Sequence, residues 1–335
     1  MGMQSPHDAA HGPLSSVAPL VLQVVLLSAF ASQQVHAQSE FLGQRFPYTA
    51  FDRLPTTPLS IGGGRLDVAF APGEFVLPRS ALMTWLKMSA EAVSVYFGKF
   101  PVASARVLIV PEAGGDVQGG TSFAYRGAAI RFIVGSDATQ SELRDDWIAV
   151  HEMTHLGLPD VGETHLWLAE GVATYVEPIA RVQAGQLTAE KIWGDMVRDM
   201  KKGLPEQGDR GLDRTPTWGR TYWGGAMFCL LADIEMRKQT GNKAGLQQAL
   251  RGVIAAGGNM EEDWPVERVF STADRATRTT VLADLYAKMA MEPYAQDLEA
   301  LWRDLGISVT GGKLTFDDSA PLASIRRAIT ARPSN

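Results

Sequence analysis

The stretch that most constrains this chain is WIAVHEMTHLGLPD at residues 147–160, where two histidines stand four positions apart and a glutamate follows the first. In an α-helix, residues i and i+4 lie on one face, about one turn apart. His151 and His155 can therefore bind one metal ion through their imidazole nitrogens, and Glu152, rotated by about 100°, stands beside that ion. This H-E-x-x-H pattern is typical of two zinc ligands and a general base.

A helix that carries two unrelated histidines is the alternative, but the three fixed residues arise by chance in well under ~1% of chains of this composition. A catalytic zinc also needs a third protein ligand and an open fourth position. The segment HLWLAEGVATYVEP at 165–178 is predicted to be a second amphipathic helix, with Glu170 among apolar residues near its start. A connecting loop with Gly157, Pro159 and Gly162 allows the chain to turn back. We therefore predict Glu170 as the third ligand.

The N-terminal segment has the pattern of an export signal. Residues 17–31 form an apolar run, which is short for a membrane span of about 20 residues. Val35 and Ala37 fit a small-x-small cleavage site, so we predict a signal peptide at 1–37 and a periplasmic or secreted protein. Residues 1–16 contain no Lys or Arg, which leaves an uncleaved anchor or a buried helix as alternatives. After cleavage we expect no stable membrane insertion.

Composition limits the partners and the chemistry. The net charge is −6 without a long basic run, so nucleic acid is not an expected partner. Apolar residues make up 45% of the chain, which predicts an ordinary packed core. Cys229 is the only cysteine and lies in the apolar run AMFCLLADI, so we predict a packed thiol rather than a nucleophile. An exported protein without disulfides suits a bacterial periplasm.

The pattern along the chain predicts a sheet-bearing N-terminal lobe at 38–138 and a helical, zinc-binding catalytic lobe at 139–335. The first lobe should hold a helix at 78–98, a buried strand at 105–111, and one long strand or a hairpin bent at Gly127. A capping box of Thr139 and Glu142 should start a helix that reaches about residue 157. A short hairpin and a last helix should end the chain. Further helices are predicted at 166–182, 188–202, 222–240, 244–256, 276–292 and 295–305.

HEMTH followed by WLAEGVATYVE resembles the gluzincin zinc metallopeptidases, and most of all the peptidase MA group with an aminopeptidase-like catalytic core. AEAVSVYFGKFP at 90–101 is similar to the helix and turn before that core's first strand. TYWGGAMFCLLADIEMRKQTG at 221–241 is similar to the segment that carries the group's catalytic tyrosine. The resemblance covers about residues 78–260. It implies an α+β fold with a thermolysin-like two-lobed metallopeptidase core, a small N-terminal sheet, a helical C-terminal lobe and one Zn²⁺ per chain between them.

The resemblance also implies a role for each residue that matches. His151, His155 and Glu170 would bind zinc. Glu152 would act on the attacking water as general base and later pass its proton to the leaving amine. Tyr222 would stabilise the oxyanion; an aromatic side chain packed at a helix start is the alternative. The protein would then be an exported, zinc-dependent peptidase with a peptide or protein as its substrate.

The chain also differs from that group. Gly224 stands where family members have a lysine, the loop before Glu170 is shorter, and the strand GGTSFAYRG at 119–127 has no acid that could hold a free amine. Exopeptidase and endopeptidase activity therefore both remain open, although the strand could pair with an extended peptide.

Two further readings of the function stay open. One is a zinc hydrolase of a non-peptide amide or ester. The other is a non-catalytic, exported binding module braced by its metal, which should show a damaged site: either Glu152 replaced or a fourth protein ligand. Glu152 is intact. His165, which we expect to be structural, is the residue that could close the site as a fourth ligand.

Overall fold

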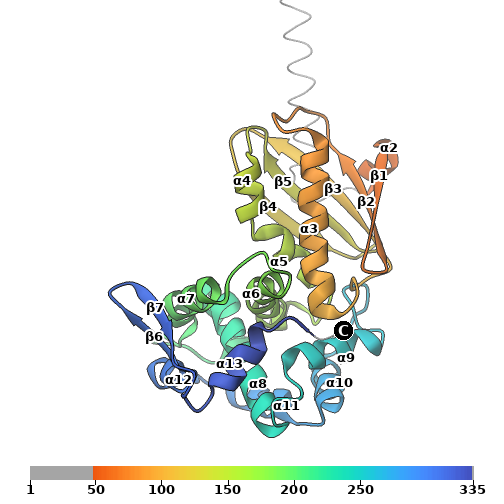
Figure 1. Ribbon diagram of the computed structural model, residues 1–335. Coiled ribbons are helices and arrows are strands. Elements are labelled where there is room, and N and C mark those ends of the chain that lie inside the picture. The colour runs from red at the N-terminus through yellow and green to blue at the C-terminus, as the bar shows by residue number, and fades with distance from the viewer. Residues whose placement is uncertain (1–47, 334–335) are drawn as a thin grey trace, which may run out of the picture.

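The computed structural model describes residues 48–333, and the predicted signal peptide at 1–37 lies outside them. A sheet and the helix that covers it form the upper part of Figure 1, and a group of helices forms the lower part. The predicted mixed α/β architecture, a small N-terminal sheet followed by a helical lobe, is confirmed at this level. Among the described residues, none of the helices combines the length and the apolar character needed to cross a membrane.

The sheet is mixed and has the strand order β1-β2-β3-β5-β4. Its strands are β1 (Thr56–Ile61), β2 (Gly64–Phe70), β3 (Ser104–Glu112), β4 (Val117–Phe123) and β5 (Ala129–Gly135). β3 lies parallel to β2 and β5 and is buried along most of its length, as expected for a central strand covered on both faces. β4 pairs antiparallel with β5 and forms one edge. The hairpin bent at Gly127, which has φ +86°, is thus confirmed over the single long strand.

Helix α3 (Arg79–Phe97) packs along one face of the sheet (Figure 1). Its apolar residues recur every three to four positions and are buried there: Leu82, Trp85, Leu86, Val93 and Tyr96. The helix ends at Gly98, whose φ of 80° is the left-handed conformation that glycine adopts without a steric cost. Tyr48 and Phe51, the latter in α2 (Thr49–Arg53), cover the opposite face at Leu108 and Val110.

The helix predicted from residue 139 to about 157 is wrong, because the chain forms two helices there, α4 (Gln140–Asp145) and α5 (Ile148–His155). The capping box of Thr139 and Glu142 is confirmed at the start of α4. Asp146 ends α4 in an extended conformation, with ψ 134°. Its carboxylate then accepts the backbone N–H groups of Ile148 at 2.9 Å and Ala149 at 3.0 Å, which starts a new helix.

A second correction concerns the C-terminal helices. The predicted helix at 276–292 is the shorter α11 (Val281–Met289), and α10 (Val266–Thr277) was not predicted. The two are separated at Arg278, which has φ +59° although it is not a glycine. Asp274 accepts the backbone N–H groups of Leu282 and Ala283 at 3.0 and 3.1 Å, so a side chain of α10 caps α11.

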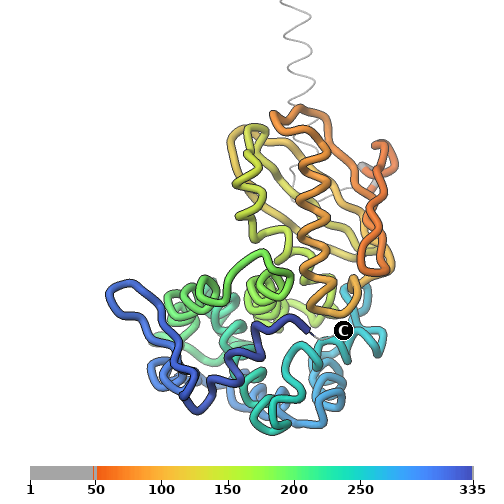
Figure 2. Tube along the Cα trace, in the orientation of Figure 1, coloured from red at the N-terminus to blue at the C-terminus, as the bar shows by residue number. Residues whose placement is uncertain are grey.

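The other helices lie within a few residues of their predicted bounds. They are α6 (Leu166–Gln183), α7 (Ala189–Asp199), α8 (Gly225–Gln239), α9 (Leu246–Ala255), α12 (Leu298–Asp304) and α13 (Ala323–Thr330), with the hairpin of β6 (Ile307–Thr310) and β7 (Lys313–Phe316). α6 and α8 touch at Gly171 and Gly225, where any side chain at Gly171 would overlap the backbone of Gly225. α13 returns to α6 (Figure 2), where Gln183 Nε2 donates to the carbonyl of Ile329 at 3.1 Å.

Candidate metal centre

Helix α5 presents His151 and His155 one turn apart, with ring centroids 5.0 Å from each other. The helix is anchored at its start by Asp146, which also accepts the indole N–H of Trp85 at 2.9 Å. Because Trp85 belongs to α3, this bond ties the first turn of α5 to the helix that covers the sheet. At the other end, Gly157 lets the chain leave the helix against the ring of Phe97, where a side chain would clash.

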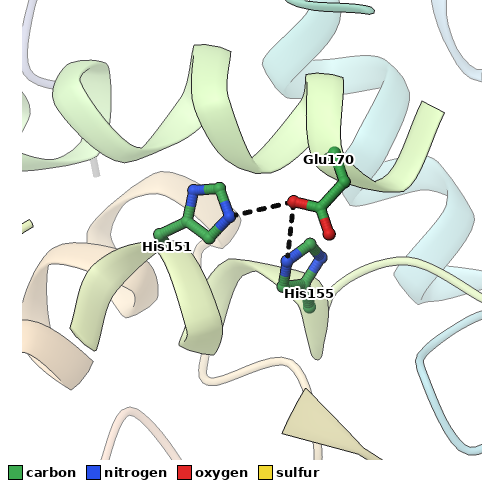
Figure 3. Close-up of side chains that lie close together, drawn as sticks. All are labelled: His151, His155 and Glu170. Atoms are coloured by element: carbon green, nitrogen blue, oxygen red, sulfur yellow. Dashed lines mark hydrogen bonds and ion pairs between the residues drawn. The ribbon is translucent and has the colours of Figure 1, made fainter. Parts of the chain in front are cut away.

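Helix α6 brings Glu170 to the same point (Figure 3). Glu170 Oε2 lies 3.1 Å from His151 Nε2 and 3.6 Å from His155 Nε2. One ligand atom from each of the three residues lies within 4.8 Å of the others. The sequence predicted this set of three, and the structure brings all three together.

The donor set fits a zinc ion. Ligand atoms at about 2.0–2.1 Å from a tetrahedral zinc stand about 3.3 Å from one another, and the two distances to Glu170 Oε2 bracket that value. Two imidazoles and one carboxylate are the ligands of a common type of catalytic zinc site. His151 is 5% exposed, so the ligand atoms are shielded on the protein side.

The same contacts shift the pKa values of Glu170 and His155. Burial by itself raises the pKa of the Glu170 carboxyl, but hydrogen bonds from His151 and His155 outweigh it and lower the pKa to about 2. Burial by itself lowers the pKa of His155, whereas its hydrogen bond with Glu170 and the charges of Glu170 and Glu152 raise it overall. The three residues thus form a strongly coupled polar group even without an ion.

Glu152 follows His151 on α5 and lines the cleft beside the ligands. Ser122 on β4 lies within hydrogen-bonding distance of it twice: its hydroxyl is 2.6 Å from Glu152 Oε2 and 2.8 Å from the Glu152 backbone oxygen. β4 comes this close because residue 120 is a glycine, at which a side chain would overlap Glu152 Cγ. Sequence reasoning missed Ser122, since nothing local links positions 30 residues apart.

Tyr222 also lines the cleft, and its ring lies 6.3 Å from that of His151 in a stacked arrangement. It belongs to η4 (Gly219–Gly224), a π-helical turn before α8, a local geometry that is often found at functional sites. Burial, followed by the charge of Glu170, raises the pKa of its hydroxyl, so Tyr222 stays protonated and can donate a hydrogen bond at neutral pH.

The turn that carries Tyr222 is anchored by Arg220. This side chain is 3% exposed, pairs with Asp209 at 2.8 Å, and donates a hydrogen bond to the carbonyl of Gly203. Both partners lie in the segment that precedes the turn. The contacts of Arg220 therefore hold η4 against the segment at 203–209 rather than against α5 and α6, the helices that carry the ligands.

His165 does not join the ligands. Its Nδ1 lies 3.0 Å from the carbonyl of Val161, and its Nε2 lies 3.1 Å from the hydroxyl of Tyr286. These contacts tie the loop before α6 to α11 and support the prediction that His165 is structural. Cys229 is buried, and burial raises the pKa of its thiol well above the usual value, as expected for a packed cysteine.

The ligands lie in a cleft of about 1130 Å³ between the sheet and the helical lobe. One wall is the edge strand β4 with the turn after it, from Gln118 to Tyr125. The other walls are α5, the loop at 158–163, the start of α6 and Tyr222. A cleft of this size accommodates several residues of an extended peptide.

Comparisons with known proteins reveal similarity in structure alone: no family model matches the sequence, and neither does any curated protein. An aminopeptidase N family protein from Idiomarina loihiensis matches over 77% of this chain and 50% of its own, with a TM-score of 0.59 and 13% identity. An M1 zinc metallopeptidase from Deinococcus radiodurans matches over 72% and 51%, with a TM-score of 0.47 and 15% identity. A mutant of the latter, bound to a Tyr-Ser-Ala substrate, has a TM-score of 0.46, 14% identity, and coverage of 72% and 52%.

The likeness to the Idiomarina protein shows that the two chains share a fold. The chain spans about half the length of the solved structures that it matches.

Proposed function

We propose that this protein is a zinc-dependent peptidase of the gluzincin type. The observation that carries the proposal is the convergence of His151, His155 and Glu170 from two helices at zinc-ligand spacing, with Glu152 beside them in the cleft. The fold shared with an aminopeptidase N family protein is consistent with it. Zinc held by these three residues would polarise the scissile carbonyl and lower the pKa of the attacking water, so that it can lose a proton near neutral pH.

The chain's own residues would carry out the proton transfers. The Glu152 carboxylate takes a proton from the attacking water and later gives it to the nitrogen of the leaving amine. Ser122 holds that carboxylate in place through its hydroxyl. The Tyr222 hydroxyl, kept protonated by burial, donates a hydrogen bond to the oxygen that gains negative charge as the carbonyl is attacked.

The edge strand β4 supports a peptide as the substrate. Within residues 48–333, β4 pairs with β5 on one side only, and its residues line the cleft. An extended peptide can add to such an edge through backbone hydrogen bonds, which do not depend on sequence. We also propose export to the periplasm or secretion, on the basis of the apolar run at 17–31 and the cleavage site after Ala37.

A non-catalytic, metal-braced module would need a protein ligand in the fourth position. His165 was the candidate for that position, and both of its ring nitrogens have other partners. Among the described residues, the potential metal-binding group that includes His151 has no fourth member. An open fourth position is what a catalytic site requires.

Mass-spectrometric profiling of a mixed peptide library tests the proposal. Zinc-loaded protein should cleave the library, and the Glu152→Gln variant should bind zinc but cleave at least about 10³-fold more slowly, because its amide cannot accept the proton. Glu299→Gln, which removes an exposed carboxylate in α12, is the control and should cleave normally. The cut positions separate exopeptidase from endopeptidase activity. No cleavage by zinc-loaded wild-type protein would reject a peptidase and point to a non-peptide amide or ester.

A further inference from the structure

Three site residues have a large apolar residue four positions before them. Trp147 precedes His151, Leu166 precedes Glu170, and Trp218 precedes Tyr222; these six positions come from three separate segments. Residues at i and i+4 of a helix share a face, so each apolar side chain stands one turn from a site residue on the same side of its helix.

All three apolar side chains are exposed, at 51% for Trp147, 51% for Leu166 and 61% for Trp218. Side chains of this size are usually buried, and a group of them around one site indicates a binding surface more often than chance. Among the described residues, eight large hydrophobic side chains are exposed, and three of them belong to this set. A fourth, Tyr125, lies in the turn after β4, on the cleft wall that β4 forms.

Ring contacts connect the two tryptophans to the metal ligand His151. The ring of Trp147 lies edge-on to that of His151, with centroids 5.3 Å apart. The ring of Trp218 stacks on that of Tyr222 at 6.0 Å, and Tyr222 stacks on His151 at 6.3 Å. Trp218, Tyr222, His151 and Trp147 therefore form one continuous aromatic row beside the ligand atoms. Trp147 and Leu166 line the cleft, whereas Trp218 is not one of its lining residues and joins the row through Tyr222.

We propose that Trp147 and Leu166, which line the cleft, bind a bulky apolar side chain of the substrate, aromatic or leucine-like, next to the bond that is cut. Trp218, stacked on Tyr222, completes this apolar collar. This inference rests on the proposed peptidase function and names its substrate class. The collar residues are half exposed in the free protein, so a substrate side chain that covers them removes apolar surface from water on both partners. Replacing that side chain by a small polar one should weaken the complex about 10- to 100-fold.

Binding to an inactive protein tests the collar without turnover. The zinc-loaded Glu152→Gln protein is titrated calorimetrically with two peptides, acetyl-Ala-Ala-Phe-Ala-Ala-amide and the same peptide with Ser in place of Phe. We expect the Phe peptide to bind at least about 10-fold more tightly. Adding Trp147→Ala or Leu166→Ala should reduce that ratio at least about threefold. Val309→Ala, which removes an equally exposed apolar side chain from β6, should leave it unchanged.

Equal binding of the two peptides, or a ratio that Trp147→Ala and Leu166→Ala do not change, would overturn the collar. Because the three side chains are exposed, loss of the fold is not expected, and a circular-dichroism melt of each variant checks this.

Cleavage of the peptide library by the wild-type protein separates this inference from the proposed function. Cuts clustered beside Phe, Tyr, Trp, Leu or Met support both. Cuts without such clustering, or clustered beside Lys and Arg, leave the peptidase standing and reject the collar. Selective binding of the Phe peptide with no cleavage of any peptide rejects the peptidase and keeps the collar as a binding site.

Discussion

At the residue scale, Glu152 is held by a contact that its own helix does not provide. The hydroxyl of Ser122 carries one hydrogen, and two oxygens of Glu152 lie within its reach. They are the carboxylate Oε2 at 2.6 Å and the backbone carbonyl oxygen at 2.8 Å. It can donate to the carboxylate while that group is charged. Once Glu152 carries a proton, the hydroxyl can rotate, donate to the carbonyl, and accept from the carboxyl. One serine therefore offers a partner to both forms of the proposed general base.

Replacing Ser122 by Ala should lower kcat about 10- to 100-fold, which corresponds to the loss of a hydrogen bond to a charged group. KM should change little, because the side chain contacts Glu152 rather than the peptide. Ser122→Thr keeps the hydroxyl and should restore most of kcat. Ser308→Ala removes a hydrogen-bonded strand serine from the β6–β7 hairpin and serves as the control. Initial rates over a range of peptide concentrations give both constants, and an unchanged kcat in Ser122→Ala would exclude the positioning role.

At the element scale, the break between α4 and α5 sets the position of α5, the helix that carries His151 and His155. Asp146 ends the first helix, caps the second, and bonds to Trp85 of α3. A straight helix from residue 139 would lack this cap. The first turn of α5 would also lose the hydrogen bond from Trp85 to Asp146, which connects it to α3. The ligand spacing of His151 and His155 is a property of α5 alone, but the position of α5 depends on this bend.

The Asp146→Ala variant should therefore lose both stability and metal affinity. Loss of an N-cap lowers the free energy of unfolding by about 1–2 kcal/mol. Thr188→Ala removes another N-cap, the one that accepts the backbone N–H of Lys191 in α7, and should cost a similar amount. Urea unfolding and zinc titration against a competing chelator measure the two effects. We expect weaker zinc binding only in Asp146→Ala, and equal zinc binding in both variants would contradict the role of the bend.

How much of this could be read from the sequence depends on how local each feature is. The three ligands were predictable because two share a helix turn and the third lies at the start of the next long amphipathic helix. Ser122 and Asp274 act on partners that only folding brings near, so no spacing indicated them. The boundary at Arg278 was hidden because a non-glycine residue adopts the left-handed conformation there.

At the scale of the whole molecule, the sheet and the helices share one core. A single cluster of buried apolar side chains runs from Leu66 in β2, through α3, α5 and α6, to Ile329 in α13. The cleft therefore lies between two parts that are packed together behind it, rather than between separately folded units. We expect the described part of the chain to unfold as one cooperative unit.

Removing zinc should lower the stability of that whole unit. A ligand present at about 1,000 times its dissociation constant stabilises the folded state by about 4 kcal/mol. Calorimetric melting of chelator-treated protein should show one transition at a lower temperature, and added zinc should restore it. His155→Ala should melt at the same temperature with and without zinc. Two separate transitions, of which zinc moves only one, would contradict the shared core.

The contact between Gly171 and Gly225 has a consequence for how the protein can change over time. Gly171 directly follows Glu170, so the spacing between α6 and α8 beside this ligand is set by backbone against backbone. Any larger residue at either position would push the two helices apart and move Glu170 with them, so we expect both positions to stay glycine as the rest of the sequence diverges.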